Sequence, residues 1–245
     1  MLGILGGSGL SRLVTLGDVQ RRVVRTSYGE PSGALSFGTI GGRELAFLAR
    51  HGDDHSIAPH RVNYRANIRA LQEAGVTEVV SIVTVGGIRP EFGPGALVLP
   101  DQIIDYTWGR PSTFFEDAGT AVTHIDFTEP YSATLRARIA GAAKACGETV
   151  AGHGVYAVTQ GPRLETAAEI NRLERDGADL VGMTGMPEAA LAREAGLEYA
   201  AIAVVANHAA GRGESVHAIS HQRLEAVVEQ AMGRVRRIIS QLVAE

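Results

Sequence analysis

Polar side chains recur where short strand-like runs of the chain end in glycine. Gly6-Gly7-Ser8-Gly9 follows the run Leu2–Leu5, and Arg50-His51-Gly52 follows the run Glu44–Ala49. Backbone N–H groups, a serine hydroxyl and an arginine guanidinium are groups that hold phosphate. Two such signals at two strand ends predict an anion site, although a tight turn would also explain the first and an exposed pair of side chains the second.

Three more polar side chains occupy similar positions near predicted strand ends. Thr84 lies just before Gly86-Gly87, and Thr184 lies in the segment Gly182–Met186, ahead of a predicted helix. Asn207 follows the last predicted strand. Because ligands of α/β sheets bind at the carboxyl ends of the strands, these residues are candidates for one site. For Thr84, packing inside the sheet is an equally good interpretation.

Glu165 lies in a predicted strand, turn and helix. Gly154–Val158 has the small and apolar pattern of a short buried strand, and Gly161-Pro162 cannot continue a ladder or a helix. Thr166 with Glu169 three residues later is a capping box that predicts a helix start. Glu165 is therefore expected beside a helix N-terminus, as an ionised acceptor facing a pocket. The alternative is a solvated glutamate in a first turn.

Several other chemistries lack the residues that they need. The chain has no Gly-x-Ser-x-Gly elbow, and its one cysteine, Cys146, lies in an alanine-rich helical stretch and receives no role. His55, His60 and Arg61 share a polar loop, but their spacing fits no zinc pattern, so no metal is expected. Phosphorolysis fits these constraints, because bound phosphate is itself the nucleophile. No cofactor is then required, and inorganic phosphate is a co-substrate.

The elements that position these residues alternate between strands and helices. Glu78–Val85 is strongly β-branched and continuously apolar, which predicts a central strand covered on both faces. The aperiodic segment 107–130 is typical of a functional or shared loop. We expect an α/β fold, one domain over residues 1–245 with a central mixed β-sheet flanked by helices. The other predicted strands are Val19–Tyr28 paired with Ala34–Ile40, then Ala96–Leu99, Gln102–Tyr106 and Asp179–Val181, and the predicted helices are Val62–Ala74, Ser132–Cys146, one from Thr166 to Gly177, one from Pro187 to Gly196 and a long amphipathic helix from Ala218.

Composition narrows the class of partner. The 245 residues are 45% hydrophobic and carry a formal net charge of −4 with mixed signs. A chain without a basic face is not expected to bind nucleic acid or an anionic membrane surface. No apolar run reaches the roughly 18 residues of a membrane span, and the start of the chain does not read as a secretory leader. A cytoplasmic protein that acts on small molecules is predicted.

Five segments carry a resemblance to a known family. In order they are Gly6–Leu10, Ala49–Gly52, Val62–Asn67, Gln160–Arg163 and Met183–Glu188. Together they resemble the trimeric purine nucleoside phosphorylase and methylthioadenosine phosphorylase family over nearly the whole chain. The resemblance implies the nucleoside phosphorylase fold, a pentosyltransferase reaction between a nucleoside and phosphate, and a homotrimer with its sites at the subunit interfaces.

The resemblance also implies roles for single residues. It implies phosphate contacts for Ser8, Arg50, His51, Thr84 and Thr184, and a catalytic role for Ser8, His51 and Asn207. Met183 would lie against the ribose. The implied base contacts are Glu165, Asn207, Ala209, Leu164 and the backbone of Val85 and Gly86. Leu164 stands where relatives have an aromatic residue, which weakens stacking on the base.

The type of base can be argued from hydrogen-bond chemistry. A 6-oxopurine presents an N1–H donor that a Glu165 carboxylate accepts, whereas the N1 lone pair of adenine would be repelled. Asn207 can donate to O6 and accept from N7–H as the base departs. The family members that take 6-aminopurines resemble Asp-x-Asp at this place, whereas this chain has Asn207-His208-Ala209. Hypoxanthine or guanine is therefore expected.

The sugar end favours a methylthio substrate. His124–Tyr131 is similar to the segment that lines the 5′-methylthio pocket in the family, and that segment reaches the site of a neighbouring subunit. With a 6-oxopurine base, the implied substrate is S-methyl-5′-thioinosine. His221 points to the alternative, because nucleoside phosphorylases use a histidine near this place for the 5′-hydroxyl group. Inosine or guanosine phosphorolysis, methylthioadenosine phosphorolysis, a nucleosidase that uses water and a purine-binding sensor remain open as alternatives.

Overall fold

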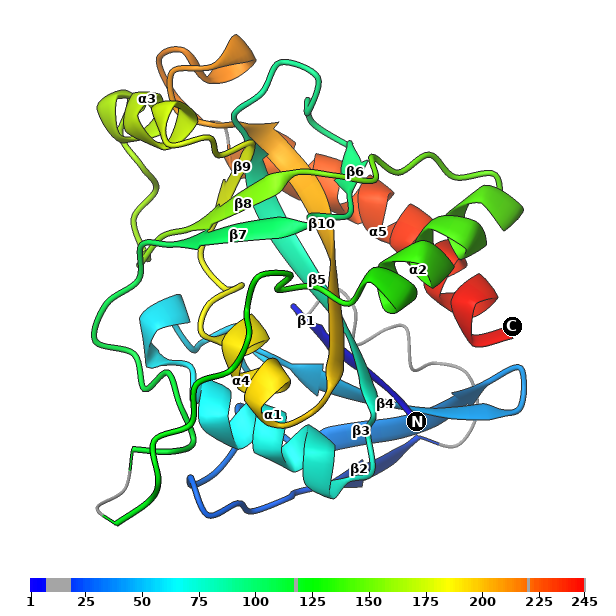
Figure 1. Cartoon of the computed structure of the whole chain (residues 1–245). Helices are drawn as coiled ribbons and strands as arrows, with labels where there is room; N and C mark the ends of the chain where they lie inside the picture. Colours follow the sequence, from blue (N-terminus) through cyan, green and yellow to red (C-terminus); the bar gives the residue numbers. More distant parts are fainter. Residues whose placement is uncertain (8–18, 117–118, 220, 245) are drawn as a thin grey trace.

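The computed structural model describes residues 1–7, 19–116, 119–219 and 221–244, and the side chains of residues 221–223 lie outside that description. Within these residues the chain forms a mixed sheet flanked by helices, as predicted (Figure 1). The strands are β1 Leu2–Gly6, β2 Gln20–Arg22, β3 Leu35–Ile40, β4 Arg43–Ala49, β5 Glu78–Gly87, β6 Leu97–Val98, β7 Gln102–Asp105, β8 Val155–Val158, β9 Leu180–Gly182 and β10 Glu198–His208. The helices are α1 Tyr64–Glu73, α2 Ala133–Ala145, α3 Ala167–Arg175, α4 Glu188–Glu194 and α5 His221–Ala244, with 3-10 turns at Pro59–Arg61 and Gly213–Ser215.

Strand β5 is the centre of the sheet, as its β-branched sequence predicts. One edge of β5 pairs with the parallel strand β10 along almost its whole length. The other edge pairs with the parallel strand β1 over Glu78–Ser81 and with the antiparallel strand β9 at Gly86 and Gly87. Between these two partners the second edge of β5 has no ladder, which leaves a break in the described sheet at Ile82–Val85. Such a change of strand partner is a common place for a ligand site.

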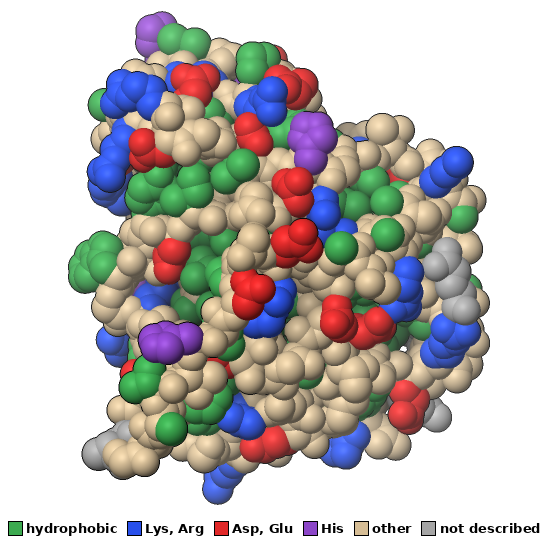
Figure 2. All heavy atoms as spheres, in the orientation of Figure 1, with side chains coloured by type: hydrophobic (Ala, Val, Ile, Leu, Met, Phe, Trp, Pro, Cys, Tyr) green, Lys and Arg blue, Asp and Glu red, His purple; other side chains and the backbone are tan. Residues whose placement is uncertain are grey.

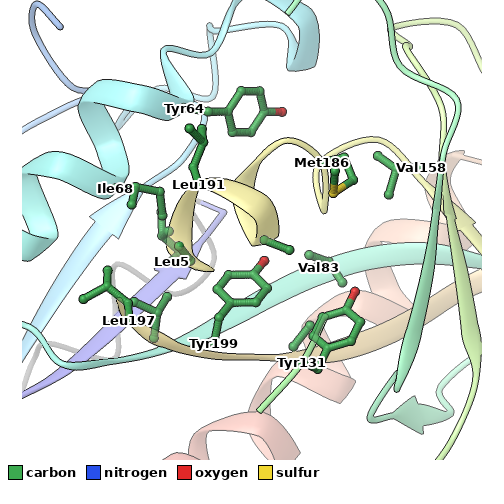
Figure 3. Close-up of a cluster of buried hydrophobic side chains, with 14 of the residues drawn as sticks. Leu5, Tyr64, Ile68, Val83, Tyr131, Val158, Met186, Leu191, Leu197 and Tyr199 are labelled. Atoms are coloured by element: carbon green, nitrogen blue, oxygen red, sulfur yellow. The ribbon is translucent and has the colours of Figure 1, made fainter. Parts of the chain in front are cut away.

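Two apolar layers cover the two faces of the sheet. Helices α1 and α4 pack on one face, where Ile68, Leu191 and Tyr199 belong to one buried cluster (Figure 3). Helices α2 and α5 pack on the opposite face around Ile139 and Val235 (Figure 1). The side chains of β5 alternate between these clusters, as the period of a strand requires.

Local signals at the helix ends agree with the sequence. Asn63 caps α1, since its side chain accepts a hydrogen bond from the backbone N–H of Ala66 at 3.1 Å. Thr166 and Glu169 form the expected capping box at the start of α3. No helix or strand occurs between Tyr106 and Ser132 in the part of the chain that the structure describes. That loop was predicted from its lack of periodicity.

Three predicted boundaries were wrong. The strand expected over Val19–Tyr28 is only β2, and Thr26 and Gly29 instead close a tight turn through two backbone hydrogen bonds. The last strand does not end before Asn207, because β10 continues to His208 through a bulge after Val205. The final helix was expected from Ala218 and begins at His221. The first two differences follow from backbone pairings that hydrophobic periodicity does not report, and the third lies within the few residues by which predicted helix ends vary.

Charged side chains of both signs are mixed over the surface in Figure 2, and no single-sign field covers this face. The hydrophobic side chains visible in this view gather mainly along one side of the molecule. None of the helices in the described residues has the length and apolar character needed to cross a bilayer. The compartment in which the chain acts stays a prediction.

Candidate phosphate and nucleoside site

A cavity of about 1040 Å³ opens at the break in the sheet. Its walls come from Gly7 after β1, from the end of β4, from the middle of β5 and from the ends of β9 and β10. The segment Pro162–Glu165, the loop before α1 and one side of α5 complete it. The sequence-predicted residues that line it are Arg50, His51, Thr84, Val85, Gly86, Leu164, Glu165, Met183, Thr184, Asn207 and Ala209.

Arg50 borders the cavity, but most of its guanidinium is bound within the protein. Its Nε and Nη2 donate to the two carboxylate oxygens of Glu188 at 2.6 and 2.9 Å, and Nη2 also donates to Ser81 Oγ at 2.6 Å. Nη1 donates to the carbonyl of Ile82 at 3.2 Å, which leaves one Nη1 hydrogen without a bond inside this network. Burial alone would lower the pKa of Arg50, but the Glu188 carboxylate outweighs it and raises this pKa above its ordinary value.

The carboxylate of Glu188 is fully buried and accepts four hydrogen bonds. Besides the two from Arg50, it accepts one from Ser81 Oγ at 2.7 Å and one from Tyr199 Oη at 2.8 Å. A buried pair of this kind is stable only because its geometry is bidentate and its remaining lone pairs are satisfied. The network joins the end of β4 to the start of α4, so it fixes two walls of the cavity.

His51 lies next to Arg50 and is also nearly buried. Its Nδ1 is 2.8 Å from the carbonyl of Ile57, which requires a proton on Nδ1 and leaves Nε2 as the unprotonated nitrogen of the neutral ring. Burial, followed by the charge of Arg50, lowers the pKa of His51 to about 4. The ring is therefore neutral at physiological pH, and its tautomer is set by the backbone.

Thr84 and Thr184 supply hydroxyl groups on facing walls. Thr84 is exposed within an otherwise buried strand, because the edge of β5 beside it has no strand partner. This exposure excludes the alternative that Thr84 packs inside the sheet. Thr184 is buried beside Tyr156, whose hydroxyl lies 3.4 Å from the Thr184 backbone nitrogen. Ser8, predicted as a third hydroxyl, lies outside the described residues, and its neighbour Gly7 lines the cavity.

Glu165 is half-buried and lines the cavity at the start of α3. Its Oε1 accepts a hydrogen bond from Thr159 Oγ1 at 2.6 Å, which is the short length typical of a carboxylate acceptor. Thr159 is itself fixed, since its backbone N–H donates to the carbonyl of Gly182 at 2.8 Å. One oxygen of Glu165 is thus oriented by the protein, and Oε2 is left for a ligand.

Asn207 reaches the cavity because of the bulge in β10. The register of β10 against β5 shifts between Val205 and Asn207, which changes the side of the sheet that the following side chains face. Asn207 Nδ2 donates to the carbonyl of His208 at 2.6 Å, so one amide hydrogen and Oδ1 are left for a ligand. Ala209 is buried next to Gly86, and an ideal Cβ at Gly86 would lie 3.3 Å from the Ala209 Cα.

The α5 wall of the cavity combines apolar and charged side chains. Leu224, Val228 and Met232 line it, and so do Glu225, Glu229 and Arg236, with Ile219 just before the helix. Leu164, which is 39% exposed, lines the cavity beside Glu165. Apolar surface next to hydrogen-bonding groups is typical of a site that binds an amphiphilic small molecule.

The structure does not bring His124 to the cavity of its own chain, and it does not describe the side chain of His221. His124 is exposed on the long loop and does not line the cavity of its own chain. His221 is the first residue of α5, but its side chain lies outside the described residues.

Sequence reasoning missed three residues that hold this site together. Glu188 and Thr159 both lie in segments that the sequence analysis considered. The partner of Glu188 is 138 positions away in sequence, and only Pro187 before it indicated a helix start. Thr159 bonds to Glu165 six residues later, across the turn at Gly161-Pro162. Arg110, in the aperiodic loop, is 8% exposed and bonds to the segments on both sides of the cavity. No local pattern indicated it.

The mixed sheet, the break at its centre and a cavity that gathers the candidate residues are typical of an α/β enzyme that acts on a small molecule. The chain matches the family model described as the phosphorylase superfamily over residues 1–244, and it belongs to that family. This confirms the resemblance inferred from the five sequence segments.

Individual relatives are consistent with the family. The chain is 58% identical over 214 residues to a probable S-methyl-5′-thioinosine phosphorylase from Xanthomonas campestris, covering 87% of this chain and 86% of that one. It is 46% identical to a 6-oxopurine nucleoside phosphorylase from Pyrococcus furiosus, covering 86% and 80%. Among solved structures, a methylthioadenosine phosphorylase from Schistosoma mansoni in complex with adenine superposes with a TM-score of 0.94, at 32% identity and covering 99% and 90%.

Replacing Glu188 tests the buried ion pair. Glu188→Gln leaves the Arg50 cation buried without a carboxylate, so the free energy of unfolding should fall by about 3–5 kcal/mol. Urea unfolding of the purified variant measures this. Glu44→Gln, at an exposed position of β4, is the control and should change stability by less than about 0.5 kcal/mol. Equal unfolding midpoints for the two variants would contradict the assigned network.

The low pKa of His51 predicts a specific acid sensitivity. Between the ordinary value of 6.5 and the folded value of about 4, the unfolded chain binds a proton at His51 and the folded chain does not. The free energy of unfolding therefore falls as the pH is lowered through this window. His51→Asn should lose less stability than the wild type across the window in urea unfolding. Thr39→Ser, at an exposed position of β3 without a titratable group, is the control and should follow the wild type. Parallel curves for all three proteins would disprove the assignment.

Proposed function

We propose that the chain catalyses the phosphorolysis of S-methyl-5′-thioinosine to hypoxanthine and S-methyl-5-thio-α-D-ribose 1-phosphate, in purine and methylthio salvage. One observation carries the proposal: the candidate base-binding and phosphate-binding residues line the same cavity, together with apolar side chains of α5. These residues are Glu165 and Asn207 for the base, Arg50, His51, Thr84 and Thr184 for phosphate, and Leu224, Val228 and Met232 of α5. Relatives named as S-methyl-5′-thioinosine phosphorylases at 52–58% identity support it.

In this reaction a phosphate oxygen attacks C1′ of the ribose as the bond to N9 of the base breaks. The free Nη1 hydrogen of Arg50 and the hydroxyls of Thr84 and Thr184 would donate to phosphate, with Ser8 as a further donor. Neutral His51 can accept a hydrogen bond at Nε2 from the O–H of a monoprotonated phosphate, which orients the attacking oxygen. The proton that phosphate loses on forming the ester balances the one that the departing base gains at N7. Met183, on the same strand end as Thr184, would contact the ribose. Inorganic phosphate is the co-substrate, and no cofactor takes part.

The electron pair of the broken bond moves into the purine. Asn207 can donate to O6 and accept from the N7–H of the departing base through its free amide hydrogen and Oδ1. Glu165, oriented by Thr159, can accept N1–H through Oε2. The backbone of Val85 and Gly86 and the side chains of Ala209 and Leu164 would enclose the ring. A 6-aminopurine leaves Glu165 facing a lone pair, and such a mismatch in a buried site is strongly unfavourable.

The group at C5′ of the ribose distinguishes the proposed substrate from inosine or guanosine. Leu224, Val228 and Met232 offer a methylthio group an apolar surface, and removing such a group from water is favourable by roughly 1 kcal/mol per buried carbon. A 5′-hydroxyl group would need a polar partner there. His221 is the predicted one, and Glu225, Glu229 and Arg236 line the same wall. Inosine or guanosine phosphorolysis is thus the second function, favoured by the relative named a 6-oxopurine nucleoside phosphorylase.

We further propose a homotrimer in which the long loop completes a neighbouring site. His124 is exposed and apart from its own cavity, and the same loop exposes Trp108 (71%) and Val122 (76%). Exposed apolar side chains of this size are typical of an interface. Light scattering of the purified chain should give three times the mass of 25.8 kDa. A monomer that is fully active at the same concentration would refute this arrangement.

An absorbance assay tests the function directly. S-methyl-5′-thioinosine, inosine and S-methyl-5′-thioadenosine are each incubated with the chain in the presence and absence of phosphate. We expect the first to be cleaved only with phosphate, inosine more slowly, and the adenosine analogue at least about tenfold more slowly. Cleavage that ignores phosphate would identify a nucleosidase, preference for inosine would establish the runner-up, and binding without any cleavage would favour the sensor.

Two variants in the same assay test how the base is chosen. Glu165→Gln loses the charged acceptor and should lower kcat/KM for 6-oxopurine nucleosides by about 10²-fold. Asn207→Asp should shift preference toward 6-aminopurines. Glu174→Gln, at an exposed position of α3, is the control for a lost carboxylate near the site. An unchanged base preference in both site variants would remove the roles given to Glu165 and Asn207.

A further inference from the structure

Arg110 is a buried arginine that receives no role in the reaction proposed above. It lies in the aperiodic loop five residues after β7, and the residue is only 8% exposed. In the described residues its hydrogen bonds go to neutral oxygens: the carbonyls of Thr159, Gln160, Met183 and Met186, the side-chain amide of Gln160 and the hydroxyl of Tyr64. A cation that is buried among the carbonyl groups of two different segments can hold those segments together.

Those carbonyls belong to the two segments that carry the ligand groups. Nη2 donates to the Gln160 carbonyl at 2.9 Å, on the segment that leads to Glu165. Nη1 donates to the Met183 and Met186 carbonyls at 2.9 and 2.6 Å, on the segment that carries Thr184. The planar fork of one guanidinium thus holds the proposed base side and the proposed phosphate side of the cavity at a fixed separation.

In the part of the chain that the structure describes, no backbone–backbone hydrogen bond joins residues 160–165 to residues 183–187. The ladder between β8 and β9 ends where the Thr159 N–H donates to the Gly182 carbonyl at 2.8 Å. Beyond that bond, residues 160–165 and 183–187 are joined through Arg110 and through packing. The packing is close, because an ideal Cβ at Gly161 would lie 2.5 Å from Met183 Sδ.

Tyr64 extends the connection to a third segment. Its hydroxyl accepts from Arg110 Nη1 at 3.2 Å and donates to the Pro59 carbonyl at 3.0 Å. Pro59 lines the cavity two residues after Ile57, whose carbonyl holds His51. Arg110 therefore bonds directly to the segments of Glu165 and Thr184, and through Tyr64 to the loop that holds His51. It makes no hydrogen bond to the ligand groups of these three residues.

We propose that Arg110 is a positioning residue that couples the base side of the cavity to its phosphate side. The proposal rests on the proposed function for the identity of the two ligands. Nucleophilic displacement at C1′ requires phosphate and base on opposite sides of the reacting carbon, so an error of about 1 Å in their separation can cost about 10²-fold in rate. Ligand binding on either side orders the same segments, which makes the two binding events cooperative.

Steady-state kinetics separate this role from a purely structural one. Arg110→Gln should lower kcat by about 10²-fold, while the Kd of each ligand measured alone should change little, because each half of the site stays intact. Arg110→Lys keeps the charge without the fork and should be intermediate. Tyr64→Phe, which removes one hydroxyl, should have a smaller effect. Arg163→Gln, an exposed arginine of the same segment paired with Glu169, is the matched control and should retain the wild-type kcat.

A rescue experiment and a binding experiment complete the test. Guanidinium ions added to Arg110→Ala should restore part of kcat, and they should not activate Arg163→Gln. In calorimetric titrations, phosphate should tighten the binding of hypoxanthine to the wild type, and this coupling should be lost in Arg110→Gln. A wild-type kcat in Arg110→Gln, coupling that survives there, or a loss of activity that only follows unfolding and resists rescue would each overturn the proposal. If the wild type does not cleave S-methyl-5′-thioinosine, the proposed function fails in the first assay, while the titration still decides on Arg110.

Discussion

The ion pair between Arg50 and Glu188 is the interaction on which the architecture of the site depends. Desolvating two charges costs several kcal/mol for each ion, and the pair offsets that cost only because Ser81 and Tyr199 satisfy the remaining acceptor sites. As a result, Arg50 reaches the cavity with its charge largely balanced and with one hydrogen to offer. A phosphate ion would then be held by hydroxyl groups, a neutral imidazole and a single guanidinium hydrogen more than by net charge. This suits a site that must also release a phosphorylated product.

The break in the sheet explains how one cavity serves two dissimilar ligands. Because β10 occupies one edge of β5 and the two partners of the other edge stop short of each other, the centre of β5 is bare where a sheet is normally closed. Thr84 is consequently exposed in the middle of a buried strand. The ends of several strands meet at this break, which brings the proposed phosphate-binding and base-binding groups to one cavity.

Much of the fold could be predicted from periodicity and caps, because both are local. The β-branched run of β5, the capping box of α3 and the aperiodic loop after Tyr106 were read correctly for that reason. The candidate ligand residues were recognisable by their places at strand ends. What could not be predicted depends on long-range pairing: Glu188 binds a residue 138 positions away, and the bulge that redirects Asn207 exists only against β5. Hydrophobic periodicity carries no information about either.

The two buried arginines differ in a way that bears on how such a site can change its specificity. Arg50 is fixed by the carboxylate of Glu188 in the core of the fold. Substitutions near the proposed phosphate-binding residues would therefore also change the stability of the protein. Arg110 is fixed only by carbonyls of segments beyond the strand ends. Glu165 and Leu164 lie on such a segment, where substitutions disturb little of the core. A change of base can therefore occur without rebuilding the proposed phosphate site, which is consistent with relatives named for different nucleosides at 46–58% identity.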